Sequence, residues 1–202
     1  MPAKTTRLRI FFAGVGGQGS LTASRLLGEI AMEAGYDVLV SELHGMSQRG
    51  GVVESSVFIG YVFGSILEDG EADLLVAFEP LEMVRAIAKA SQGTTVLCNT
   101  RPILPSTVSR GQARYPGIDL MLDAVRPEVG QLVSFDATDL AVQAGSVLAT
   151  NMVMLGATCA SGILPFARED YHRVIEDKTP ERFRETNIKA FEAGYRAVTE
   201  AR

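Results

Sequence analysis

A glycine-rich turn between an apolar run and a helix pattern is the feature that most constrains how this chain folds. The apolar residues 8–12 lead into GVGGQG at residues 14–19, and apolar residues with helical spacing follow over residues 21–34. A second apolar run occupies residues 38–40. This order of strand, turn, helix and strand places backbone N–H groups at the positive end of a helix. The turn is therefore suited to hold an anion, usually a phosphate.

The remainder of the chain continues the alternation of strands and helices. Four further strands are predicted, over residues 52–60, which alternate as a half-buried strand does, 73–78, 94–99 and 132–137. Helices are predicted from Pro80 to about residue 91, over 139–164 as two tightly packed helices, over 167–177, and from Pro180 onward. Residues 100–127 contain several prolines and are interpreted as a loop-like region.

These elements predict one domain over residues 1–202, without internal repeats or linkers. The fold class is α/β: a Rossmann-like, doubly wound domain whose mostly parallel sheet has helices on both faces.

Composition excludes several classes of protein. A formal net charge of −5 argues against non-specific nucleic-acid binding. No apolar stretch approaches the roughly 20 residues of a membrane helix, and the N-terminus lacks a signal-peptide core, so we expect a cytoplasmic protein. The chain has two cysteines, Cys98 and Cys159, which we expect to be buried thiols. Since an iron–sulfur cluster usually needs four thiolates, we expect none on this chain.

The candidate site combines the glycine turn with the sequence ELHGMSQRGG that follows the second strand. If the second strand lies beside the first, both loops emerge at the carboxyl edge of the sheet, where ligands bind in such folds. The guanidinium of Arg49 suits a phosphate there. The predicted cofactor-binding residues are Gly16, Gly17, Gln18, Gly19, Ser20, Glu42, His44, Ser47, Gln48, Arg49 and Gly50. No catalytic or metal-binding residue is predicted.

Other interpretations of these residues remain open. The glycines also fit a dinucleotide site, in which Glu42 would bind the ribose hydroxyls, or a turn that only permits close packing. A stand-alone NAD(P)- or flavin-dependent enzyme would need a catalytic constellation, which His44 and His172, the two histidines, do not supply. A non-catalytic partner protein of the same fold would show an exposed apolar patch.

The glycine turn and the HGMSQRGG run together carry a family resemblance. The sequence from Ile10 to Gly60 resembles the opening of the gamma-type subunits of 2-oxoacid:ferredoxin oxidoreductases. Within that family, ELHGMSQRGG is most similar to the small subunits of the indolepyruvate enzymes. The similarity continues more thinly around Asn151, Leu164-Pro165 and Asn187.

The resemblance implies a multi-subunit enzyme that oxidatively decarboxylates a 2-oxoacid, forms an acyl-CoA and passes electrons to ferredoxin. Thiamine diphosphate and the iron–sulfur clusters are then expected on a larger catalytic partner subunit. This chain is expected to bind no cofactor tightly, to complete the assembly, and to offer its glycine turn to the phosphates of coenzyme A. It should be inactive and a homodimer in isolation. One departure from some relatives is that Arg25 and Arg49 are the only cations near the turn, where those relatives carry lysines.

Overall fold

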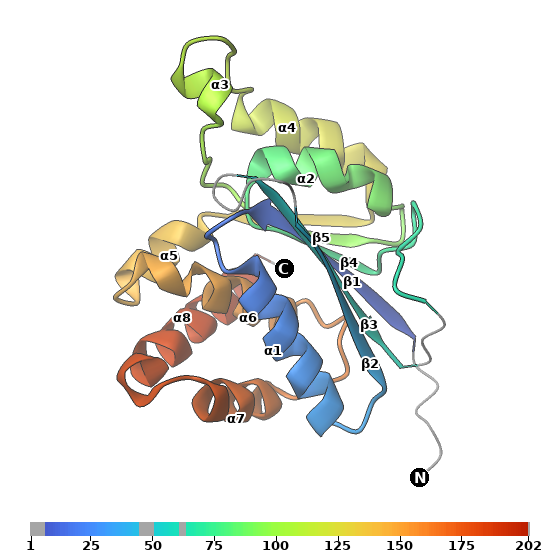
Figure 1. Ribbon diagram of the computed structural model, residues 1–202, viewed down its shortest axis with the longest axis vertical. Coiled ribbons are helices and arrows are strands. Elements are labelled where there is room, and N and C mark those ends of the chain that lie inside the picture. Colours follow the sequence, from blue (N-terminus) through green and yellow to red (C-terminus); the bar gives the residue numbers. More distant parts are fainter. Residues whose placement is uncertain (1–6, 45–50, 61–63, 202) are drawn as a thin grey trace.

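The computed structural model describes residues 7–44, 51–60 and 64–201, without the side chain of His44. Its centre is a six-stranded sheet in the order β2-β3-β1-β4-β5-β6 (Figure 1). The strands are β1 (Leu8–Val15), β2 (Val38–His44), β3 (Val52–Ile59), β4 (Leu74–Ala77), β5 (Thr95–Asn99) and β6 (Gln131–Phe135). β3 is antiparallel to both of its neighbours, while β1, β4, β5 and β6 pair in parallel. The predicted mostly parallel α/β sheet is confirmed.

Helices cover both faces of the sheet, as predicted (Figure 1). On one face lie α1 (Ser20–Glu33), α5 (Ala137–Gln143), α6 (Thr150–Ala160), α7 (Arg168–Lys178) and α8 (Glu181–Glu200). On the other face lie α2 (Pro80–Ala86) and α4 (Ile118–Val125). Short 3-10 turns at Ile87–Lys89, Arg126–Glu128 and Val147–Ala149 complete the element order. The sheet has a hydrophobic core on each face, and side chains along a strand alternate between these two cores. In β1, Phe12 belongs to the core on the side of α1 and Phe11 to the core on the side of α2.

The second strand does not lie beside the first, and that expectation was wrong. β3 lies between β1 and β2 and pairs along both, with Val57 opposite Ile10 on one side and Val40 on the other. Both faces of this central strand are also covered, with Val57 and Ile59 in the core on one face of the sheet and Phe58 in the core on the other. Residues 55–60 are accordingly buried, where the alternating pattern predicts a half-buried strand. β2 still points in the same direction as β1, so both strands end at the same edge of the sheet.

The region 100–127 is not a loop throughout, which corrects a second expectation. It contains the short helix α3 (Ser106–Ser109) and the longer α4, in which Leu122 and Val125 are buried in the same core as α2. Pro102 precedes α3, and the other prolines of this region lie between these helices or at their ends, where they do not interrupt the helical hydrogen bonds. Figure 1 shows α3 projecting from the body of the molecule beyond α2 and α4.

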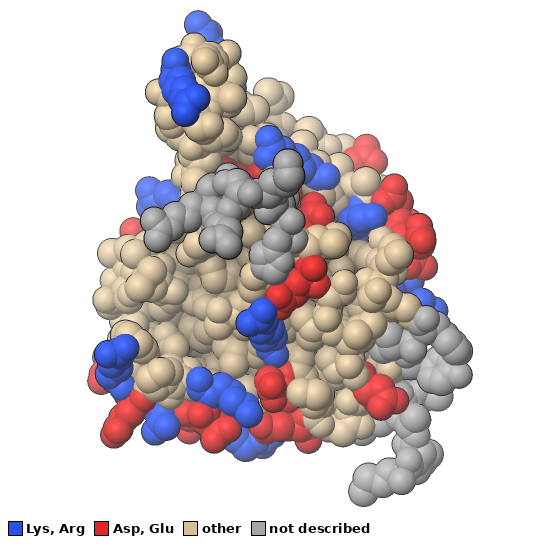
Figure 2. All heavy atoms as spheres, viewed as in Figure 1, with Lys and Arg blue, Asp and Glu red and all other residues tan. Residues whose placement is uncertain are grey.

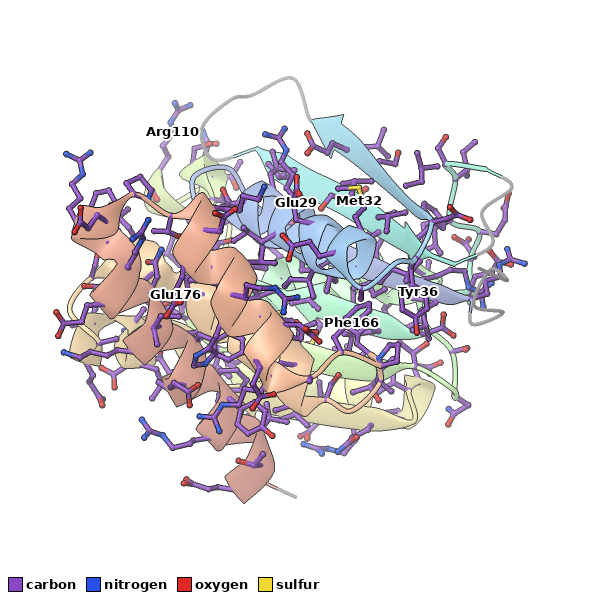
Figure 3. The ribbon with its side chains drawn as sticks, turned by 90° about the horizontal axis from the view of Figure 1, so that it is seen from below. Glu29, Met32, Tyr36, Arg110, Phe166 and Glu176 are labelled. Atoms are coloured by element: carbon purple, nitrogen blue, oxygen red, sulfur yellow. The ribbon has the colours of Figure 1, made fainter. Side chains whose placement is uncertain are left out.

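The helices at the C-terminal end pack unusually closely. A Cβ atom added at Gly156 of α6 would lie 1.9 Å from the carbonyl oxygen of Phe191 in α8, and one at Gly194 would lie 1.8 Å from that of Val153. Only glycine permits this backbone approach. Tyr36 and Phe166 meet edge to face with ring centroids 5.5 Å apart, which ties the end of α1 to the segment before α7 (Figure 3).

Both cysteines are free thiols, Cys98 fully buried and Cys159 partly buried. Burial raises the pKa of both thiols, that of Cys159 to about 12, so neither forms a ready thiolate. In the described ranges, no helix is both long enough and apolar enough to cross a membrane.

Candidate functional site

The glycine turn connects the end of β1 to the start of α1 at the carboxyl edge of the sheet. Gly17 adopts a φ of 103°, and a Cβ placed on it would meet nothing within 4 Å. Gly19 is the N-cap of α1 with a φ of 78°, and its α-carbon faces the side chain of Asn151 in α6. The first turn of α1 has no acidic residue. The turn therefore presents the positive end of a helix beside a glycine that leaves its surroundings open.

Gln18 has a structural role inside the turn. Its Oε1 accepts a hydrogen bond from the backbone N–H of Val15 at 2.8 Å, and its Nε2 donates to the carbonyl oxygen of Phe78 at 2.7 Å. The amide thus joins the turn to the end of β4. Both ends of this side chain are engaged within the protein, so a ligand at the turn is met chiefly by backbone N–H groups.

The neighbouring loop returns to the same turn. The N–H of Gly16 donates to the carbonyl oxygen of Gly51 at 2.9 Å, which places the residue before β3 directly against the turn. At the same edge His44, the last residue of β2, pairs with Val53. Ser47, Gln48, Arg49 and Gly50 lie outside the described residues, as does the side chain of His44. The chain on both sides of this segment is nevertheless held at the carboxyl edge.

Glu42 contacts α1. Arg25 donates to both of its carboxylate oxygens, from Nε to Oε1 at 2.6 Å and from Nη2 to Oε2 at 2.8 Å. Glu42 raises the pKa of Arg25, first through these hydrogen bonds and then through its charge. This two-point ion pair ties the edge strand β2 to α1, and it leaves Arg25 neutralised rather than available to a phosphate.

Sequence reasoning missed three polar residues at this edge. Asn99, at the end of β5, donates to the carbonyl oxygen of Phe78 and accepts from the N–H of Ala137, each at 3.0 Å. Asn151 packs against Gly19. Glu79, which follows β4, is 1% exposed. A polar residue at the end of an apolar run is the signal that could have found Asn99 and Glu79.

The Glu79 carboxylate accepts hydrogen bonds on both of its oxygens. Its Oε2 accepts from the N–H groups of Leu81 and Glu82, at 2.7 and 3.0 Å, and so caps α2. Its Oε1 accepts from the N–H of Ile103 at 3.1 Å and from the hydroxyl of Tyr115. Burial, together with this hydrogen bond to the carboxylate, raises the pKa of Tyr115. Glu79 thereby joins the end of β4, the start of α2 and the segment around α3.

The family model for pyruvate ferredoxin/flavodoxin oxidoreductase matches residues 9–197. This chain belongs to that family. The family resemblance inferred from the glycine turn and the HGMSQRGG run is thereby confirmed.

Individual relatives agree with this assignment. The chain is 42% identical to the indolepyruvate oxidoreductase subunit IorB of Methanothermobacter thermautotrophicus, over 95% of this chain and 98% of the relative. It is 27% identical to the ketoisovalerate oxidoreductase subunit VorA of Methanothermobacter marburgensis, covering 93% of this chain but 36% of that longer one. Among solved structures, the keto/oxoacid ferredoxin oxidoreductase gamma subunit of Geobacter sulfurreducens superimposes with a TM-score of 0.69 at 25% identity, covering 96% of this chain and 99% of that subunit.

Proposed function

We propose that this chain is the small, cluster-free subunit of a thiamine-diphosphate-dependent 2-oxoacid ferredoxin oxidoreductase that acts on indolepyruvate or a similar 2-oxoacid. The observation that carries the proposal is the 42% identity to IorB over nearly the whole of both chains. The larger catalytic subunit holds the thiamine diphosphate and the iron–sulfur clusters and passes electrons to ferredoxin. This chain completes that assembly and is inactive as an oxidoreductase alone.

Its own chemical contribution is to hold the phosphates of coenzyme A at the glycine turn. When bound, coenzyme A supplies the thiol that takes up the acyl group. The turn suits its phosphates because Gly17 faces open space and the N-terminus of α1 carries no competing acidic side chain. Arg49, in the loop that leaves β2, adds a charge-assisted contact beside Ser47 and Gln48 in this proposal.

A stand-alone NAD(P)- or flavin-binding protein has less support. A dinucleotide site needs an acid at the end of the second strand to accept the ribose hydroxyls. Both carboxylate oxygens of Glu42 already bind Arg25, so this acid is engaged in holding β2 to α1.

Three further features belong to the proposal. Residues 1–202 act as one gamma-type domain, the isolated domain is a homodimer, and the protein works in the cytoplasm. An extensive interface is expected because obligate subunit contacts typically bury about 2,000 Å² or more.

The test uses the complex reassembled from this chain and its catalytic subunit. Calorimetry of coenzyme A binding should show about 10-fold or greater weakening for Gly17→Ala, since the new methyl group occupies the space the phosphate needs. Arg49→Ala should weaken binding by about 10- to 150-fold, the range for one charge-assisted contact. The matched control is Gly35→Ala. Gly35 also has a positive φ, 81°, and a Cβ added to it would meet nothing within 4 Å, but it lies beyond the other end of α1.

Gly17→Ala and Gly35→Ala should lower the melting temperature by similar amounts, since both force alanine into the left-handed region. Only Gly17→Ala should affect coenzyme A. Unchanged affinity in both Gly17→Ala and Arg49→Ala would place coenzyme A elsewhere. A chain that does not associate with the catalytic subunit at all would overturn the subunit assignment itself.

A further inference from the structure

Residues 100–117, here called the arm, form a basic segment that includes the projecting helix α3 (Figure 1). They contain Arg101, Arg110 and Arg114 and no acidic residue, in a chain with a formal net charge of −5. Arg101 pairs with Asp136 at 2.8 Å. Arg110 and Arg114 are exposed, and neither forms an ion pair within the described part of the chain. The face shown in Figure 2 carries basic and no acidic groups on the projecting arm, and Figure 3 places Arg110 at the periphery.

The arm is held in place rather than loosely attached. The Oε1 atom of Glu79 accepts hydrogen bonds from Ile103 near its beginning and Tyr115 near its end. Because Glu79 is buried, these bonds anchor both ends of the arm to the start of α2. A partner therefore meets a preformed surface and does not have to order the segment on binding.

A pocket of about 470 Å³ lies between the arm and α2. Ile103 and Leu104 line it from the arm, and they are 38% and 52% exposed, large values for apolar side chains. Val15, the last residue of β1 before the glycine turn, forms part of its wall. The pocket and the candidate coenzyme A site are therefore neighbours at one edge of the sheet.

An incompletely bonded carboxylate also lines this pocket. Glu82 is 4% exposed, and its Oε1 accepts a hydrogen bond from Arg85 at 2.6 Å. Its Oε2 is buried without a hydrogen-bond partner among the described residues. A buried acceptor left unpaired destabilises the protein, so a hydrogen-bond donor that a partner brings to it would stabilise the complex.

We propose that the arm and this pocket form the docking site for an acidic segment of the catalytic subunit. The segment places carboxylates against Arg110 and Arg114, an apolar side chain against Ile103 and Leu104, and a hydrogen-bond donor at Glu82. This inference rests on the proposed function, since it names the surface through which that function is assembled.

Position and chain architecture favour this occupant over a second copy of the chain. The pocket shares Val15 with the approach to the glycine turn, so the polypeptide that completes that site is brought against the arm. In VorA of Methanothermobacter marburgensis the matching region is 36% of a longer chain, so there the domain has a permanent covalent neighbour. Opposite charges across such a surface accelerate association and select the partner.

The test compares two double charge reversals in the full-length chain, with binding to the catalytic subunit measured by surface plasmon resonance. Arg110→Glu/Arg114→Glu alters the arm. Arg126→Glu/Arg196→Glu is the control, with the same change in charge at two exposed positions outside the arm. The arm variant should bind at least about 10-fold more weakly, mainly through slower association, and the deficit should shrink in high salt. The control should stay within about 3-fold of the parent, and both variants should melt like the parent because these side chains are exposed.

Each other outcome has a distinct meaning. Parent-like binding by the arm variant overturns the docking proposal and leaves the subunit assignment intact. If the arm variant loses only a homodimer, seen by sedimentation, while binding the catalytic subunit normally, the occupant is a second copy and the proposal is wrong. If the parent does not bind the catalytic subunit, the proposed function fails, and the docking proposal fails with it.

Discussion

Replacement of Glu79 by glutamine isolates the role of one buried carboxylate in organising the carboxyl edge. Glu79 accepts four hydrogen bonds, two on each oxygen, from Leu81, Glu82, Ile103 and Tyr115. Glutamine has nearly the same shape but a single acceptor oxygen. If that oxygen keeps the two bonds that cap α2, the new NH₂ group faces the N–H of Ile103 and the hydroxyl of Tyr115. The hydroxyl can turn to accept, whereas the N–H of Ile103 loses its partner.

The expected loss of stability follows from the number of hydrogen bonds that are weakened or lost. Hydrogen bonds to a charged group contribute about 1.5–3 kcal/mol each, and neutral ones about 0.5–1.5 kcal/mol, so two bonds weaken by roughly 1 kcal/mol apiece. The orphaned N–H of Ile103 adds about 1–3 kcal/mol, and the smaller desolvation cost of a neutral amide offsets part of the sum. A net loss of about 3 kcal/mol lowers the melting temperature of a chain of this size by about 6–12 °C.

Thermal unfolding of the isolated chain measures the loss of stability, and hydrogen exchange measures the lost hydrogen bond at the amide of Ile103. Glu79→Gln should destabilise by about 3 kcal/mol and speed exchange at the amide of Ile103. Tyr115→Phe removes one of the four donors and should cost roughly half as much. Glu128→Gln, at an exposed position, serves as the control and should stay within about 0.5 kcal/mol of the parent. A Glu79→Gln protein that melts with the parent and protects Ile103 equally well would refute this account of the arm.

Two further predictions concern packing and pH. Gly156→Ala should melt at a much lower temperature than Gly28→Ala. The methyl group added at Gly156 would lie 1.9 Å from a backbone oxygen, whereas the one added at Gly28 would lie 2.9 Å from a valine methyl group. Equal melting temperatures of the two variants would contradict the packing argument. Burial raises the pKa of Glu82, so the ionised carboxylate destabilises the folded protein, and this cost grows as the pH rises through that pKa. In urea titrations, the stability of Glu82→Gln relative to the parent should therefore increase from about pH 4 to pH 8, and a constant or falling difference would show that burial does not raise this pKa.

Local patterns in the sequence predict the glycine turn well and the role of Gln18 poorly. The glycine turn and the helix after it are predicted from residues that are close together in the sequence. The structure agrees, because α1 begins at Ser20, directly after the turn. The amide of Gln18 instead bonds to Phe78, which is 60 residues away. No pattern within the turn indicates whether this side chain faces a ligand or another strand.

The order of the strands depends on pairings that are distant in sequence. The apolar and polar alternation in residues 52–60 predicts a half-buried strand, yet Val57, Phe58 and Ile59 are apolar in succession and all buried. Three successive apolar residues indicate a strand covered on both faces, which is a central strand. That run predicts a central position for β3, but its two neighbours, β1 and β2, are set by the long-range pairings.

The position of the arm, residues 100–117, is related to the burial of the Glu79 carboxylate. An acidic residue before Pro80 predicts an N-cap, and the cap occupies only Oε2 of Glu79. At 1% exposure, the other oxygen cannot rely on water, so donors must come from elsewhere in the chain. The segments that leave the neighbouring strands at the same edge can supply these donors, and here the one that follows β5 does so. An acid that caps a helix at the buried end of a central strand therefore predicts that a later segment folds back over it, as Ile103 and Tyr115 do.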